Sequence, residues 1–179
     1  MKNCIITASG KEIDFLNPIS ADISINDIAF ALSHLCRYTG HTAEFYSVAQ
    51  HSLLVSYAVP EEYALQGLLH DAAEAYLGDV SSPLKSLLPD YQAIEKKLEK
   101  LIWTTFGLND ELHQSVKDAD MLLLRSEAKD LLKLKQERRW ELFGHGETLP
   151  FKIIPMDPLD ARTLFINRFK KITSLALVH

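Results

Sequence analysis

Apolar residues recur every three or four positions through most of the chain, a period typical of helices that bury one face. Two helix starts are marked by capping-box patterns, Ser24-x-x-Asp27 and Ser47-x-x-Gln50. Pro60 suits the first position of the helix that follows. Together these signals predict helices over residues 24–40, 47–58, 60–77, 90–107, 111–139 and 158–175.

The N-terminal residues follow a different pattern. Residues 4–7 and 12–15 are predicted to be short strands, because they flank a plausible turn at Ser9-Gly10. A two-stranded ribbon is not stable alone, so we expect it to lie against the helices. The predicted fold class is therefore all-α, a bundle of about six helices with a small N-terminal β-hairpin.

No repeat, low-complexity tract or linker divides the chain, so residues 1–179 are predicted to form a single domain. Its parts are a ribbon and lead-in, a helical core, and a loop with a C-terminal helix, over residues 1–23, 24–139 and 140–179 respectively. Residues 79–89 are expected to be a second loop, with a short turn of helix inside it.

Composition narrows the class of protein. The 179 residues are 47% hydrophobic and 24% charged, with a net charge of −5. That charge argues against a binder of nucleic-acid polymers, although a local basic patch would suffice for a small anionic substrate. No apolar run has membrane-spanning length, so no membrane contact is expected. Cys4 and Cys36 are expected to be free thiols in a reducing compartment, which predicts a cytoplasmic protein.

The stretch of residues 68–79 places ionisable groups within an apolar helix pattern. On a helix His70, Asp71 and Glu74 would share one face, and Gly78 would end the helix just before Asp79. Buried ionisable groups are usually paired or bound to metal. A His-Asp pair alone is a weak signal, so a metal site needs further ligands from elsewhere in the chain.

Two further residues could complete such a site. His51 lies early in the preceding helix, and Asp120 interrupts an apolar helix face, where Asp118 is the competing carboxylate. Two imidazoles and two carboxylates suit zinc, manganese, cobalt or iron better than calcium. We therefore expect one divalent ion (Mn, Co, Zn, Fe or Mg) at His51, His70, Asp71 and Asp120.

In order along the chain, these motifs resemble the HD-domain metal-dependent phosphohydrolases, whose pattern is H…HD…D. The nearer resemblance is to the branch of the YfbR-like 5'-deoxynucleotidases, and it covers about residues 25–133. The matching segments are Arg37-Tyr38, Gln50-His51-Ser52, His70-Asp71-Ala72-Ala73-Glu74, Gly78-Asp79, Pro83-Leu84-Lys85 and Val116-Lys117-Asp118-Ala119-Asp120.

This resemblance implies an HD-type helical fold and a phosphohydrolase that removes phosphate from a small nucleotide, a (deoxy)nucleoside 5'-monophosphate in the first instance. It also implies that Glu74 and Asp79 are catalytic, and that Arg37, Tyr38 and Lys85 bind substrate. A homodimer is an expectation from the same resemblance. In the absence of such roles, Asp79 would cap a helical turn, Arg37 would complement the dipole at a helix C-terminus, and Lys85 would be solvated or structural.

The chain departs from that branch on the side where the branch binds sugar and base. Tyr38 stands where the nucleotidases have Trp, and Gln50 where they have Glu. The substrate therefore stays open at this point. The alternatives are nucleoside triphosphate hydrolysis or phosphodiester cleavage at the same metal site, and a non-catalytic binding module that keeps the fold.

Overall fold

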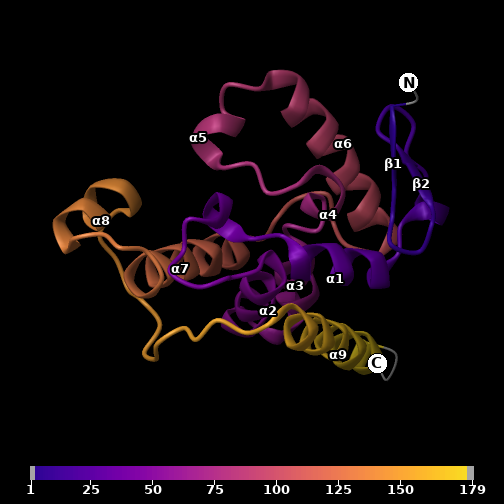
Figure 1. Ribbon diagram of the computed structural model, residues 1–179. Coiled ribbons are helices and arrows are strands. Elements are labelled where there is room, and N and C mark those ends of the chain that lie inside the picture. The colour runs from indigo at the N-terminus through magenta and orange to yellow at the C-terminus, as the bar shows by residue number, and fades with distance from the viewer. Residues whose placement is uncertain (1–2, 177–179) are drawn as a thin grey trace.

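The protein is mostly helical, as the apolar periodicity predicts (Figure 1). The structure is a computed structural model that describes residues 3–176. Strands β1 (Cys4–Ile6) and β2 (Glu12–Asp14) form the expected antiparallel ribbon. In the described part six helices have eight or more residues: α1 (Ile25–His34), α2 (Val48–Ala58), α6 (Pro89–Thr105), α7 (Gln114–Asp130), α8 (Gln136–Phe143) and α9 (Pro158–Ala176).

Shorter elements join them. These are α3 (Ala64–Leu69), α4 (Glu74–Leu77) and α5 (Ser82–Lys85), with 3-10 turns at Ser20–Asp22, Arg37–Gly40 and Glu61–Tyr63. Helices α2 and α3 lie at the centre of the molecule, and α2 packs against α1, α3, α7 and α9 (Figure 1). Within residues 3–176, no helix combines the length and the apolar character that crossing a membrane would require.

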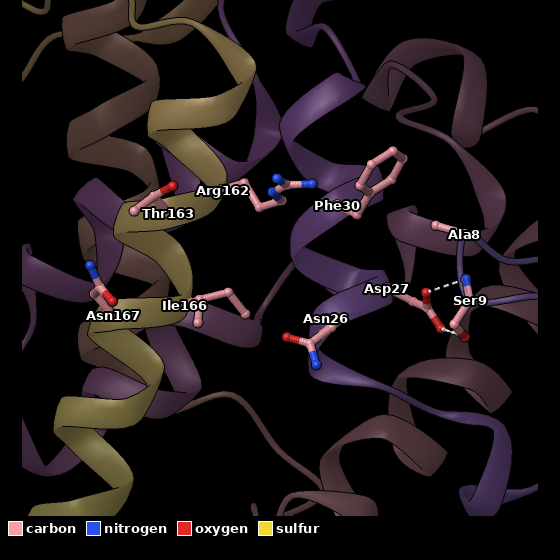
Figure 2. Close-up of a pocket in the computed structure, with 9 residues that line it drawn as sticks. All are labelled: Ala8, Ser9, Asn26, Asp27, Phe30, Arg162, Thr163, Ile166 and Asn167. Atoms are coloured by element: carbon pink, nitrogen blue, oxygen red, sulfur yellow. Dashed lines mark hydrogen bonds between the residues drawn. The ribbon is translucent and has the colours of Figure 1, made fainter.

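The hairpin is attached to α1 through a buried carboxylate. Asp27, only 4% exposed, accepts hydrogen bonds from the backbone N–H and the hydroxyl of Ser9, at 2.9 and 2.6 Å (Figure 2). Ile13 of β2 is 1% exposed and joins the core. The predicted capping box at Ser24 is therefore wrong, because its Asp27 binds the hairpin and the Ser24 side chain makes no cap bond.

The second predicted cap is confirmed in its serine half. Ser47 Oγ accepts a hydrogen bond from the Gln50 backbone N–H at 3.1 Å and starts α2. The Gln50 side chain does not turn back to the cap. Its amide donates to Ile154 O and accepts from Met156 N, at 2.8 and 3.0 Å, so it holds the segment before α9 against α2.

Three predicted helices are interrupted. The helix predicted over residues 24–40 ends at His34. The helix predicted over residues 60–77 breaks between α3 and α4, where the Glu74 backbone N–H donates to Asp71 O, three residues back. The helix predicted over residues 111–139 divides into α7 and α8, and the loop expected to begin at residue 140 begins only after Phe143. Tertiary contacts end α7, since Leu131 O accepts from Ala43 N and the Asp130 carboxylate accepts from Ile153 N.

Arg168 links α9 to α2. Its side chain is 2% exposed and donates to Ser56 Oγ and Ser56 O at 2.8 and 2.9 Å, and to both carboxylate oxygens of Glu61 at 3.0 Å. Its guanidinium also lies over the Tyr57 ring, 4.4 Å from the centroid. One cation therefore bonds α2, the turn after it and α9.

We predict that Arg168→Ala lowers the free energy of unfolding by about 2–4 kcal/mol, because it leaves the buried Ser56 groups without a donor. Glu61 is 57% exposed and regains water, which keeps the loss below that of a fully buried pair. Denaturant unfolding measures it. Exposed Lys170 on the same helix is the control, and Lys170→Ala should change stability by no more than about 0.5 kcal/mol. Equal losses in the two variants would contradict the prediction.

Candidate metal centre

Three elements bring the candidate ligands together. His51 lies in the first turn of α2, His70 directly follows α3, and Asp120 lies in α7. One ligand atom from each lies within 4.8 Å of the others, so this group could hold a metal ion. His51 is 0% and His70 6% exposed, whereas the Asp120 side chain is 41% exposed and lies at the open side of the group.

The separations match those of ligands around one ion. His51 Nε2 lies 3.3 Å from His70 Nε2 and 3.1 Å from Asp120 Oδ1, and His70 Nε2 lies 4.0 Å from Asp120 Oδ1. Nitrogen and oxygen ligands at about 2.0–2.2 Å from a metal are about 3–4 Å apart in tetrahedral or octahedral geometry. The three side chains therefore need no large movement to bind one ion.

Asp71, the fourth expected ligand, lies beside this group. Its Oδ2 is 3.2 Å from His70 Nε2, 3.6 Å from His51 Nε2 and 3.5 Å from Arg37 NH1. Burial raises the pKa of Asp71, but His70, His51 and Arg37 outweigh burial and lower it below its ordinary value. The carboxylate is therefore charged and within reach. Asp118, the competing candidate, is exposed and accepts a bond from Gln114 instead.

Hydrogen bonds fix both imidazoles in one tautomer. His70 Nδ1 lies 2.8 Å from Gly67 O, and His51 Nδ1 lies 2.6 Å from Glu127 Oε1. Both partners are acceptors, so each Nδ1 donates a proton to its partner, and Nε2 of each ring is the atom left to bind a metal ion. The two Nε2 atoms lie 3.3 Å apart, beside the Asp120 carboxylate. This arrangement favours a cation at their meeting point.

The pKa of His51 also shows that the carboxylates around it favour a positive charge at this position. Burial and the nearby Arg37 lower this pKa, while the carboxylates of Glu127 and Asp120 raise it, and the balance is a value of about 9. Without a metal ion a proton therefore occupies His51 at neutral pH. A divalent ion would replace that proton and supply the charge that the carboxylates require.

Glu127 is a site residue that the sequence reasoning missed. Its carboxylate is fully buried and accepts bonds from four donors, at 3.2 Å from Arg37 Nε, 2.9 Å from Tyr38 Oη, 2.9 Å from Tyr46 Oη and 2.6 Å from His51 Nδ1. Burial raises the pKa of Glu127, but Arg37 and His51 lower it to about 2. Glu127 lies seven residues after Asp120, two turns along the same face of α7, and that spacing was the available signal.

Glu74 and Asp79 lie next to the group but differ from its members. Glu74 begins α4, is 7% exposed, and its Oε2 has no hydrogen-bond partner within the described chain. Burial, Asp71 and Asp79 raise the pKa of Glu74 well above its ordinary value. Asp79 follows Gly78, whose φ of 82° permits the turn, and burial also raises the pKa of Asp79. The Glu74 carboxyl group therefore holds a proton more readily than an ordinary glutamate does.

The three expected substrate-binding residues do not lie together. Arg37 and Tyr38 lie beside the metal-centre residues, because both bond Glu127. Lys85 bonds Glu95 at 2.6 Å, so it is neither free nor simply solvated. Glu95 is 8% exposed, so this ion pair is largely shielded from water.

A cavity of about 620 Å³ lies elsewhere, between the hairpin turn, α1 and α9 (Figure 2). Its lining includes Phe30, Arg162 and the Asp27 carboxylate already bonded to Ser9. None of the metal-centre residues lines it. The candidate metal ligands therefore lie where α2, the end of α3 and α7 meet, and not at this cavity.

Comparison with known proteins identifies relatives over nearly the whole chain. No model of a known protein family matches it. An uncharacterized protein of Rhodobacter capsulatus is 34% identical over 150 residues, which cover 76% of each chain. The uncharacterized protein YfdR of Escherichia coli K12 is 42% identical over 172 residues, which cover 96% of each chain. With 42% identity over 96% of each chain, the chain belongs to the family of the E. coli protein YfdR.

Proposed function

We propose that the protein is an HD-type metal-dependent phosphohydrolase that removes phosphate from a small nucleotide, a (deoxy)nucleoside 5'-monophosphate in the first instance. The observation that carries the proposal is the convergence of the Nε2 atoms of His51 and His70 with the Asp120 carboxylate. The order of motifs along the chain, from Arg37 to Asp120, supports the HD assignment and the choice of a phosphate substrate.

His51, His70, Asp71 and Asp120 would hold one divalent ion. When bound, such an ion lowers the pKa of water toward neutrality and withdraws charge from a phosphate oxygen. The protein orients the ligands. Gly67 O and the Glu127 carboxylate accept the Nδ1 protons of His70 and His51, and so direct Nε2 of both rings toward the metal position.

Proton transfer falls to the two carboxyl groups beside the ligands. We assign Glu74, whose pKa burial raises, as general acid, donating a proton to the leaving 5'-oxygen as the P–O bond breaks. Asp79 accepts the proton from the water whose oxygen forms the new bond to phosphorus. Their environments separate the two roles, since Glu74 is nearly fully buried and Asp79 is half-buried.

Arg37 would bind the phosphate. A guanidinium has five N–H donors, and Arg37 directs Nε to Glu127 and NH1 to Asp71, so others stay available for an oxyanion. Tyr38 uses its hydroxyl on Glu127, which leaves its ring to contact the sugar. A screen of nucleoside mono-, di- and triphosphates with Mn, Co, Mg and Zn, with products identified by mass, tests the activity and substrate together.

We predict that His70→Ala weakens divalent-metal binding more than about 100-fold, because even the loss of a group that only orients a ligand costs 10–100-fold. Metal content after dialysis against limiting metal measures it. The matched control is His34→Ala, since His34 is exposed and bonds only within its own helix. Equal metal content in the two variants would remove His70 from the ligand set.

For Glu74→Gln we expect unchanged metal content and a turnover rate lower by about 10²–10⁴-fold, the usual effect of losing a general acid. The glutamine fills the same space but cannot give up a proton. Steady-state kinetics on the metal-loaded variant checks this, with metal analysis of the same sample. Turnover close to that of the wild type would exclude Glu74 from the proton transfer.

Glu127→Gln should weaken metal binding by about 10–100-fold, since it removes the negative charge that holds His51 and Arg37. It should also lower the free energy of unfolding by about 3–5 kcal/mol, because Arg37 loses a buried partner. Asp118→Asn, an exposed change on the same helix, is the control for both measurements. If the folded Glu127→Gln protein binds metal as tightly as the control does, Glu127 has no role in orienting His51.

A further inference from the structure

A second cavity, of about 380 Å³, lies between the C-terminal half of α7, helix α8 and the loop that follows it. We call it the α7–α8 cavity. Its volume is in the range of small-molecule sites. Arg125 and Lys129 line it from α7, five and nine residues after Asp120, which turns them to roughly the opposite side of that helix from the metal centre. In Figure 1, α8 lies at the far end of α7 from the core.

The lining is strongly basic. Arg125, Lys129 and Arg139 all border the cavity, and no carboxylate within residues 3–176 lines it. Among the ion pairs of the described residues, none involves any of these three cations, although Arg37, Lys85 and Arg168 each have a carboxylate partner. A chain with net charge −5 thus keeps three unpaired cations around one hollow. Such a grouping is stabilised by an anion.

Both guanidiniums are held in place by neutral groups. Arg125 Nε donates to Phe143 O at 3.2 Å, and Arg139 NH1 donates to Lys129 O at 3.2 Å. A carbonyl orients a guanidinium without cancelling its charge. Each arginine therefore has further N–H donors that bond to nothing in the described chain, and these suit the paired oxygens of a phosphate.

Gly146 shapes the same feature from the loop. A Cβ atom at this position would lie 2.6 Å from Arg125 NH1, so the backbone packs directly against the guanidinium. The clash would be with the flexible end of a side chain. A small substitution at Gly146 would therefore move the Arg125 head group and leave the backbone in place.

The cavity also has an aromatic wall. Trp140 lines it and is 42% exposed, although tryptophan side chains are on average largely buried. The His145 ring lies against it with 4.6 Å between ring centroids. A flat ring beside three cations is the combination that binds a nucleobase and its phosphates.

We propose that the α7–α8 cavity is a second ligand site, and that it takes a phosphate-bearing molecule with an aromatic ring, a nucleotide. Arg125, Lys129 and Arg139 contact the phosphates, and Trp140 stacks on the base. This site needs no metal ion and shares no residue with the metal centre. It therefore stands or fails independently of the hydrolase activity.

Tryptophan fluorescence tests the proposal directly. The chain has two tryptophans, and Trp103 is 5% exposed, so a soluble ligand quenches mainly Trp140. With EDTA present to keep the metal centre empty, ATP should quench fluorescence in a saturable way. Inorganic tripolyphosphate should displace ATP with lower affinity, and adenosine should bind more weakly than either. Absence of saturable quenching by ATP would overturn the proposal.

Three variants sharpen the test. Lys129→Ala removes one exposed cation and should weaken ATP binding by about tenfold or more, as expected for a hydrogen bond to a charged group. Gly146→Ala keeps every charge but displaces Arg125, and should weaken binding too. Lys117→Ala removes an exposed cation from the same helix outside the cavity and should leave affinity unchanged. If Lys129→Ala and Gly146→Ala bind ATP as tightly as Lys117→Ala does, the cavity is not the binding site.

Discussion

The arrangement of the site depends on one buried carboxylate. Glu127 is without solvent exposure, and it bonds Arg37, Tyr38, Tyr46 and His51 at once. A lone charge in such a place would cost several kcal/mol. Here Arg37 balances it, and the remaining oxygen capacity is used by two hydroxyls and an imidazole N–H. Four groups from the segment between α1 and α2 and from α2 itself are thus fixed relative to α7, and the tautomer of His51 follows from the same bond.

Helix α7 therefore contributes residues to both the metal centre and the α7–α8 cavity. Asp120 and Glu127, two turns apart on one face, meet α2 and the end of α3. Arg125 and Lys129 lie on the opposite side and face α8. The end of α7 is bonded to the loop before α2 through Leu131 O and Ala43 N. A ligand in the α7–α8 cavity would thus contact the helix that also positions His51.

The sequence predicts the helices and the candidate ligand residues from two different kinds of pattern. Helix existence follows from local periodicity, and the candidate ligands stand in an ordered motif. The breaks near residues 35, 70–73 and 131–135 were missed because no Gly or Pro lies in them, and tertiary bonds such as Asp130 to Ile153 N end the helices instead. Glu127 was missed because its four partners lie 76–90 positions away, where no local pattern connects them.

The turn that carries Arg37 shows how the fold supports such a site. Tyr38 and Thr39 both adopt positive φ, 54° and 52°, which costs an L-residue about 1–2 kcal/mol each. The bonds of Arg37 N to Tyr46 O and of Tyr38 Oη to Glu127 offset that strain. The tyrosine at the position where the nucleotidases have tryptophan therefore has a structural task beside any contact with sugar. A change at Tyr38 would alter the strained turn and the environment of Arg37 together, because both side chains bond Glu127.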